Sequence, residues 1–374
     1  MAIAINWLSA VRARAGDHVD YRYEFYGEED GRMQINTHSV LFEKQLIESV
    51  TAKGGLIYDG ISGASPNGSP PHGNSQQVPL TKLTDIRRAG NVEIDLRQGI
   101  QTLSPQVSYS KESDYESTGI ALNDALEFNQ KNTTLRLGAA HNFDRVLDTG
   151  SPRKYQPKET TDGLVGFSQL LDPKTIVAAD FTFGYDSGYL TDPYRRVLFR
   201  GWLTAIPGVP LYITYPEVRP SHRSKEVLQT SLLHFFDRLN GSGEFTYRFY
   251  HDSYDVYAHT AALAWHQRLG GHLILAPAFR VYEQSTASFY TPQGVPGLSP
   301  IDGDRTRPKY YSADYRLSHM LTLTYGLKVT IIVADWLYLD VGFHRYEMYG
   351  LDSITSPSAY PKANIVTAGL RLLF

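Results

Sequence analysis

The sequence predicts an all-β chain that closes into a single antiparallel transmembrane β-barrel of about sixteen strands. Three observations predict this fold. Apolar and polar side chains alternate along most of the chain, short connections alternate with long ones, and the last segment is amphipathic and ends at Phe374. Such alternation puts successive side chains on opposite faces of a strand, as in barrels that have a lipid-facing and a lumen-facing side.

Composition excludes several other classes. The chain has 374 residues and a formal net charge of -3, with 36 Lys plus Arg against 39 Asp plus Glu, so no basic surface points to nucleic acid. No stretch reaches the roughly 20 apolar residues that a spanning helix needs. The chain contains no Cys, which excludes disulfides, thiolate metal sites and a Cys nucleophile.

The alternation is clearest in two runs. Across Val19–Phe25 one face is wholly apolar and the other wholly charged, and Leu321–Ile331 is long enough for a tilted spanning strand. Runs of this kind predict strands at 18–27, 32–46, 49–59, 88–98, 101–112, 118–129, 132–144, 162–171, 174–186, 225–237, 243–253, 256–269, 271–284, 313–333, 336–349 and 363–374.

The connections between these strands separate into two classes. Tight turns rich in Gly, Asn and Pro are expected at 98–100, 130–132, 172–174, 240–242 and 269–271. Long loops are expected at 60–87, 145–161, 187–224, 285–312 and 350–362. Outer-membrane barrels show this asymmetry, with short turns on the periplasmic side and long loops outside.

One domain is expected, a barrel over residues 18–374, preceded by a periplasmic segment at 1–17. The loop at 187–224 is rich in Pro and Arg but also apolar at Val197–Phe199, so it should fold inward or contact a partner. The loop at 60–87 is rich in Gly, Ser, Pro and Asn and is expected to be mobile.

The C-terminal strand resembles a known signal. Its alternating apolar residues end at an aromatic carboxy-terminal residue, Phe374. This resembles the targeting strand of outer-membrane proteins that the bacterial barrel-assembly machinery reads. The alternative is an ordinary last amphipathic strand.

Four segments stand out beyond the strand pattern, namely Ser108–Ser117, Phe128–Leu135, His141–Val146 and Gly188–Tyr194. They resemble a bacterial family catalogued as domain of unknown function 3570. The resemblance runs over nearly the whole chain, from Asp17 to Phe374, and it implies a multi-pass barrel in the bacterial outer membrane, in contact with membrane lipid. It supplies no catalytic residues.

If the apolar face meets lipid, the opposite face lines the lumen. The ionisable residues expected there are Arg22, Glu24, Glu93, Asp95, Arg97, Lys111, Arg136, Asp180, Glu244, Arg248, Arg268, Arg280, Lys328, Asp340 and Arg371. A barrel of about sixteen strands leaves an aqueous channel unless loops plug it. These charges would then act on a passing hydrophilic solute in a porin-like conduit. Alternatively, they pair across strands and brace the wall.

Two other classes of function stay open. A scaffold could sheathe or dock a periplasmic or extracellular partner, such as a redox component, in the lumen or at the loop 187–224. A barrel hydrolase could use residues near one rim, namely Ser110, Glu112, Ser113, Asp114, His141 and Asp144. We expect no enzyme and no cofactor. We expect no metal either, because the twelve His are scattered without metal-ligand spacing.

Overall fold

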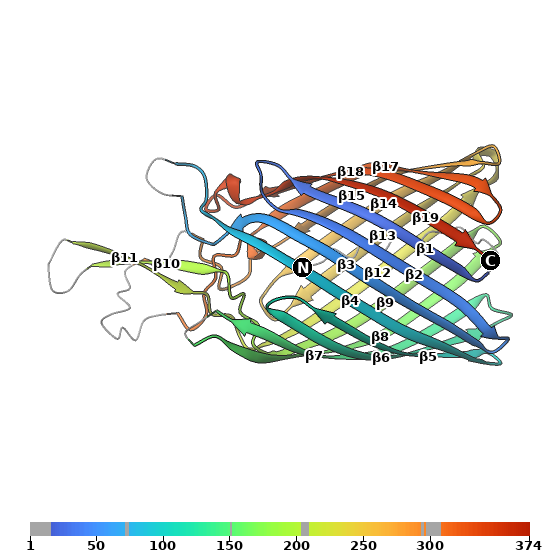
Figure 1. The fold of residues 1–374 in the computed structure, drawn as a ribbon, viewed down its shortest axis with the longest axis horizontal. Helices are drawn as coiled ribbons and strands as arrows, with labels where there is room; N and C mark the ends of the chain where they lie inside the picture. Colours follow the sequence, from blue (N-terminus) through green and yellow to red (C-terminus); the bar gives the residue numbers. More distant parts are fainter. Residues whose placement is uncertain (1–15, 72–74, 150–151, 203–208, 293–294, 297–307) are drawn as a thin grey trace.

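A computed structural model describes residues 16–71, 75–149, 152–202, 209–292, 295–296 and 308–374. Sixteen strands form one closed barrel (Figure 1). Their bounds are β1 His18–Glu28, β2 Gln34–Ile47, β3 Val50–Pro66, β4 Leu80–Gln98, β5 Gln101–Lys111, β6 Tyr115–Phe128, β7 Thr133–Asp148, β8 Lys154–Asp172, β9 Thr175–Gly188, β12 His222–Phe236, β13 Gly241–Asp252, β14 Tyr257–Leu269, β15 Leu273–Gln284, β17 Met320–Ala334, β18 Leu337–Gly350 and β19 Lys362–Leu373.

Neighbouring strands in the barrel are antiparallel, and most follow one another in the sequence. The ring closes where β1 pairs with β19, from His18 opposite Leu373 to Glu28 opposite Ala363. The predicted all-β closed barrel is therefore confirmed. None of the described helical turns is long or apolar enough to cross a bilayer.

The end of the barrel that holds the C-terminus carries the tight turns. Several of them use left-handed backbone, at Gly99 (φ 60°), at Gly270 (φ 62°) and at Asn129–Lys131. Because short turns lie on the periplasmic side of outer-membrane barrels, we take this as the periplasmic end. The expected periplasmic segment 1–17 falls, up to residue 15, outside the described residues.

At the opposite end the strands run far beyond the length that a bilayer requires. β4 and β8 have 19 residues each, whereas about 9–11 cross the hydrocarbon. The loops predicted at 60–87 and 145–161 are therefore largely strand, and only 67–79 and 149–153 connect. Above the membrane the outer face need not be apolar, so alternation fades while backbone pairing continues.

A second correction concerns the strand predicted at 313–333. β17 begins at Met320, and the residues before it form loop and a 3₁₀ turn, η2 Tyr315–Leu317. Ala313, Tyr315 and Leu317 alternate with polar residues because each packs into a different one of three buried loop clusters. Their two-residue spacing is the same as that of a strand.

Three short strands lie outside the barrel wall. β10 Arg196–Trp202, β11 Pro210–Pro216 and β16 Val295–Pro296 form a separate sheet in the order β11-β10-β16. The β10–β11 hairpin projects beyond the barrel at the end away from the C-terminus (Figure 1). The apolar run Val197–Phe199 of the loop 187–224 belongs to this hairpin.

The outer surface of the barrel carries a continuous apolar girdle. Adjacent register positions join five strands from β12 to β17. The side chains there are Leu232, Phe245, Leu263, Phe279 and Tyr325, each more than 40% exposed. Apolar side chains so exposed fit a face in contact with lipid tails.

Candidate functional site

The side chains between the girdle positions face the interior of the barrel. The strand registers place twelve ionisable residues on this inner face, namely Arg22, Glu24, Glu93, Asp95, Arg97, Arg136, Asp180, Glu244, Arg248, Arg280, Asp340 and Arg371. Lys328 lies there too. Lys111 does not lie there. It comes two residues after Tyr109 and four after Val107, which are both exposed on the outer face of β5, so Lys111 faces outward as well.

One ion pair spans three strands. Arg136 on β7 donates from Nη2 to Asp180 Oδ1 on β9 at 2.6 Å. The pair passes over Gly166 of β8, where a Cβ atom would lie 2.2 Å from Asp180 Oδ1 and 3.0 Å from Arg136 Nε. Glycine at this inner position leaves room for the two side chains to meet above the intervening strand.

The acidic residues of β4 are held in a similar way. Lys53 Nζ on β3 lies 2.6 Å from Asp95 Oδ2 and 3.4 Å from Glu93 Oε1. Arg97 Nη2 lies 2.7 Å from Glu127 Oε2 on β6. These side chains are a sixth to nearly half exposed, so each pair contributes little, about 0–1 kcal/mol, to stability.

Near the seam of the barrel, Arg371 of β19 pairs with Asp20 of β1 through Nε at 2.7 Å and also through Nη2. Asp340 on β18 accepts a short hydrogen bond from Thr330 and lies 3.8 Å from Lys328 Nζ. Seven of the twelve predicted lumen residues therefore belong to cross-strand ion pairs.

The other five have no oppositely charged side chain within 4.0 Å among the described residues. They are Arg22, Glu24, Glu244, Arg248 and Arg280. Arg280 lies over the ring of Tyr282, 5.6 Å from its centroid. Arg248 and Arg280 sit on β13 and β15, on either side of β14. Three of these five are cations, Arg22, Arg248 and Arg280, that have no carboxylate partner among the described residues.

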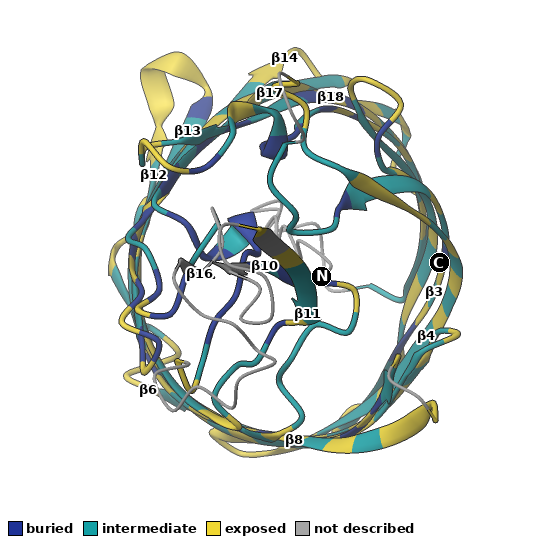
Figure 2. Cartoon of the chain, turned by 90° about the vertical axis from the view of Figure 1, so that its left-hand side faces the viewer, coloured by how far each residue is buried: buried dark blue, intermediate teal, exposed yellow. Residues whose placement is uncertain are grey.

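Loops fold over the mouth opposite the periplasmic end. We call the described parts of segments 189–221, 285–319 and 351–361 the cap. Figure 2 looks into this end and shows the cap lying across the opening, with β10 and β11 over its centre. The loop 187–224 therefore packs inward for part of its length, which is one of the two arrangements that the sequence predicted for it.

Three buried apolar clusters hold the cap together and to the wall. In the first, Phe199 of β10 packs edge-on against Tyr311, with ring centroids 5.0 Å apart. The third joins Tyr315 and Tyr360 of the cap to Met320 and Met348 on the inner faces of β17 and β18. The remaining cluster centres on Tyr254, Val256, Ala287, Phe289, Tyr290 and Leu317.

A charged network lies between these clusters. Asp314, 1% exposed, accepts from Arg316 Nε at 2.8 Å and from Arg219 Nη2 at 2.8 Å. Arg316 Nη2 also reaches Asp192 at 2.6 Å. Glu217 accepts from the Asp192 backbone N–H at 2.6 Å and lies 2.6 Å from Arg219 Nε. We call Asp192, Arg195, Glu217, Arg219, Asp314 and Arg316 the latch; its formal charges sum to zero.

The latch shifts the pKa values of its acids in opposite directions. Burial alone would raise the pKa of Asp314, but the charges of Arg316, Arg195 and Arg219 lower it below its ordinary value. The pKa of Asp192 is also lowered, because Arg316 and Arg195 outweigh burial. Burial raises the pKa of Glu217 against the opposing charge of Arg219.

Sequence reasoning did not find the latch. Its members come from separate loops, and no spacing links residues 192–219 to residues 314–316. The one local signal was the acid and base at Asp314 and Arg316 inside an otherwise apolar alternating run, which instead suggested a strand.

The residues considered for a hydrolytic site do not assemble into one. His141 lies on the outer face of β7, where its Nδ1 meets Thr161 Oγ1 at 2.8 Å. Asp144 lies on the inner face and accepts from Tyr115 Oη at 2.5 Å, with Lys158 Nζ at 3.2 Å. The barrel wall therefore separates the His141 side chain from the Asp144 carboxylate, so the two cannot act together as base and acid.

One group of carboxylates could in principle hold a cation. Asp85, Glu112 and Asp114 place one oxygen each within 4.8 Å of one another. Asp85 accepts hydrogen bonds from the Ser113 backbone N–H at 3.2 Å and from Ser113 Oγ at 2.9 Å. Acidic groups of this kind are common on protein surfaces, and we assign them no ion.

A family described as "Protein of unknown function (DUF3570)" matches the sequence over residues 4–156 and 147–355. No curated protein matches. The chain therefore has its sequence relatives in a family without an assigned activity.

Solved structures show the fold. A "Bacterial polysaccharide outer membrane secretin" superposes with a TM-score of 0.51 at 9% identity, over 97% of this chain and 99% of that one. CdiB from Acinetobacter baumannii gives a TM-score of 0.49 at 8% identity over 96% and 60%. The siderophore receptor PirA from Pseudomonas aeruginosa gives 0.43 at 9% over 96% and 61%. The chain spans about three fifths of the latter two proteins. The secretin likeness concerns the fold. Together with the closed barrel and its exposed apolar outer face, this fold is that of a multi-pass β-barrel in the bacterial outer membrane.

Proposed function

Because the chain belongs to the family described as "Protein of unknown function (DUF3570)", which carries no assigned activity, we propose its function from the barrel itself. It is a porin-like conduit that passes hydrophilic solutes across the outer membrane. Its channel-like barrel is shared with the secretin fold. The passage of hydrophilic solutes through this barrel is our proposal.

The observation that carries this proposal is the chemistry of the inner face. Charged residues line it on strands all around the ring, while the outer face is apolar. Most of these charges neutralise one another, so the wall is hydrated without strongly attracting one sign. Five of them are unpaired among the described residues. The three cations Arg22, Arg248 and Arg280 outnumber the two anions Glu24 and Glu244, so the remaining charge favours an anionic solute.

The cap supports a conduit with restricted entry. It crosses the mouth and is fastened to β17 and β18 through Met320 and Met348. A buried, charge-balanced latch is a discrete structure that can be broken as a unit. We therefore propose that the cap narrows the extracellular entrance and sets the size of solute that passes.

Single-channel conductance in a planar bilayer tests the proposal, with ion selectivity taken from the reversal potential under a salt gradient. We expect stable conductance steps with a preference for anions. The double variant Arg248→Gln and Arg280→Gln should move the reversal potential toward cations. The matched control is Arg345→Gln, which removes a cation from the outer face of β18 and should leave selectivity unchanged. A barrel that inserts but stays silent, even with the cap released, would contradict the conduit.

The protruding sheet favours a second candidate, docking of a protein partner. β11 pairs with β10 on one side, and within the described residues its other side has no strand. Tyr212 on β11 is 63% exposed. An open strand edge can accept a strand from another chain. A photo-reactive residue at position 212 should then cross-link to one discrete protein in intact cells, whereas a diffuse pattern would count against docking.

A further inference from the structure

We propose that the outer wall of the barrel carries a binding groove for a lipid whose phosphate headgroup has a net negative charge, built by β3, β4 and β5. The groove is independent of solute passage through the lumen. Three features carry the proposal: an apolar hollow in the lipid-facing wall, a pair of cations at one end of it, and the level of that pair relative to the membrane.

The hollow has a volume of about 1000 Å³, at the upper end of the 300–1,000 Å³ that small-molecule sites usually have. Its apolar lining on the outer face comes from Leu56, Ile86, Val92, Val107 and Tyr109. The register places Gly90 between Leu56 of β3 and Tyr109 of β5. Because Gly90 has no side chain, the Leu56 side chain lies close to its backbone, with Cδ2 3.1 Å from the place a Cβ would take.

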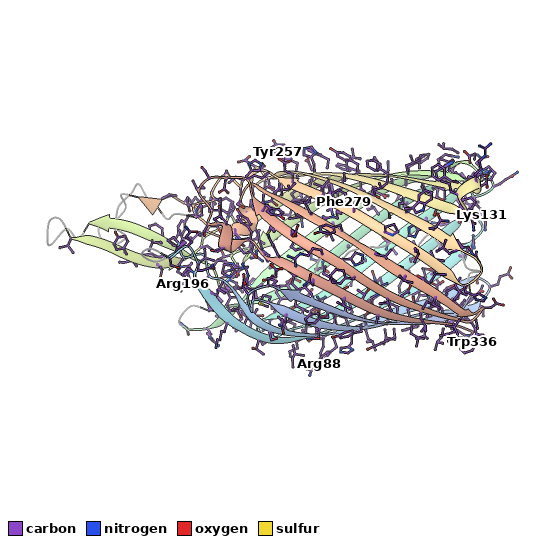
Figure 3. All side chains as sticks on the ribbon, turned by 90° about the horizontal axis from the view of Figure 1, so that it is seen from above. Arg88, Lys131, Arg196, Tyr257, Phe279 and Trp336 are labelled. Atoms are coloured by element: carbon purple, nitrogen blue, oxygen red, sulfur yellow. The ribbon has the colours of Figure 1, made fainter. Side chains whose placement is uncertain are left out.

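Two cations stand at the extracellular end of the hollow. Arg88 of β4 and Lys111 of β5 line it and occupy directly opposite register positions. Both are exposed, and Figure 3 shows Arg88 pointing away from the barrel. Among the described residues neither has a carboxylate within 4.0 Å. Like charges directly opposite one another destabilise a sheet, so this pair calls for an anion between them.

The nearby carboxylates do not supply that anion. Glu116 lies opposite Lys111 on β6, but its oxygens accept from Tyr109 Oη at 2.7 Å and lie 3.4 Å from Arg145 Nη1. Asp85 and Glu112 also line the groove. Both belong to the inward-facing set of their strands, where Asp85 accepts from Ser113 and Glu112 lies 3.9 Å from Arg87 Nε.

The level of the pair matches that of lipid headgroups. Tyr58 is the register partner of Arg88, and Tyr109 is two residues from Lys111. Tyrosines gather where hydrocarbon meets headgroups. Val92 and Val107, opposite each other, lie nearer the middle of the wall. A lipid can therefore place its acyl chains along the valines and its phosphate between the two cations, which act as charge-assisted donors.

The test is lipid retention by the full-length, folded barrel in detergent, measured by native mass spectrometry after incubation with phosphatidic acid or phosphatidylcholine. We expect at least about tenfold more phosphatidic acid than phosphatidylcholine on the wild type. The double variant Arg88→Gln and Lys111→Gln should lose about tenfold of the phosphatidic acid. The matched control, Arg345→Gln with Lys362→Gln, removes two outward cations from β18 and β19 and should retain it.

A third variant separates a groove from a merely positive surface. Val107→Trp keeps both cations but fills the hollow at a side chain that is 58% exposed, so it should also lower retention. The groove proposal is overturned if Arg88→Gln with Lys111→Gln loses no more lipid than the control. It is equally overturned if Val107→Trp binds as the wild type does, because charge alone would then explain the binding. Heat-dependent electrophoretic mobility confirms that each variant is a closed barrel.

Discussion

Replacing Asp314 by Asn should open the cap. The amide keeps the volume of the side chain but removes the central negative charge, which accepts from both Arg316 and Arg219 at 2.8 Å. Three arginines would then share only Asp192 and Glu217. Breaking a buried ion pair on one side costs about 3–5 kcal/mol. Because each 1.4 kcal/mol is a factor of ten, the ratio of open to closed cap should rise roughly one hundred to a few thousand fold.

The assay is single-channel recording of the wild type and Asp314→Asn, combined with limited proteolysis from the extracellular side. The variant should spend a much larger fraction of time in a high-conductance state, and protease should cut the cap more quickly. Asp237→Asn is the control, because Asp237 pairs with Lys174 at an exposed periplasmic turn and its loss should cost at most about 1 kcal/mol.

The double variant Asp314→Asn with Arg316→Gln tests where the energetic penalty comes from. If the main penalty is an arginine left without its carboxylate, the double variant should open the cap less than the sum of the single effects predicts. Our account of the latch is refuted if Asp314→Asn leaves the open fraction and the cleavage rate unchanged while the barrel remains folded.

Three further predictions concern the pH response of the cap, the glycine at position 166 and the C-terminal residue Phe374. Acid should open the cap below pH 3.8, the ordinary pKa of aspartate. The lowered pKa values of Asp192 and Asp314 stabilise the closed cap above that pH, and this stabilisation is lost as the two carboxylates are protonated, while the raised pKa of Glu217 offsets part of the loss. Conductance recorded between neutral pH and pH 3 tests this. Gly166→Ala should displace the Arg136–Asp180 pair and shift ion selectivity, yet change the unfolding free energy measured in urea by no more than about 1 kcal/mol. Deleting Phe374 should lower the fraction of chain inserted in the outer membrane of intact cells, and normal insertion would exclude it as an assembly signal.

Alternation predicted the wall because each spanning strand faces two different solvents. The run Leu321–Ile331 shows this directly, since lipid requires every second side chain to be apolar and the lumen permits the others to be polar. The tight turns were equally visible, because left-handed positions such as Gly99 and Gly270 favour glycine. Both signals are local, so one sequence suffices to show them.

The cap and the outer groove were not predictable in this way. The latch brings Asp192 and Glu217 to Arg316 across a hundred residues, and only the folded loops define that neighbourhood. Lys111 was assigned to the lumen because it is charged. The register shows that it faces outward, at a level where headgroups rather than hydrocarbon surround the wall, so charge is tolerated there.

The seam between β1 and β19 has a consequence for how the protein is made. Its register joins eleven residues at the start of the described chain to eleven at its end. A ribosome delivers β1 first and β19 last, so every partial product has two unpaired strand edges and exposed apolar side chains. Such edges are templates for aggregation, and contacts this distant in sequence form slowly. We therefore expect an unclosed state after synthesis whose open edges need to be covered until β19 pairs with β1.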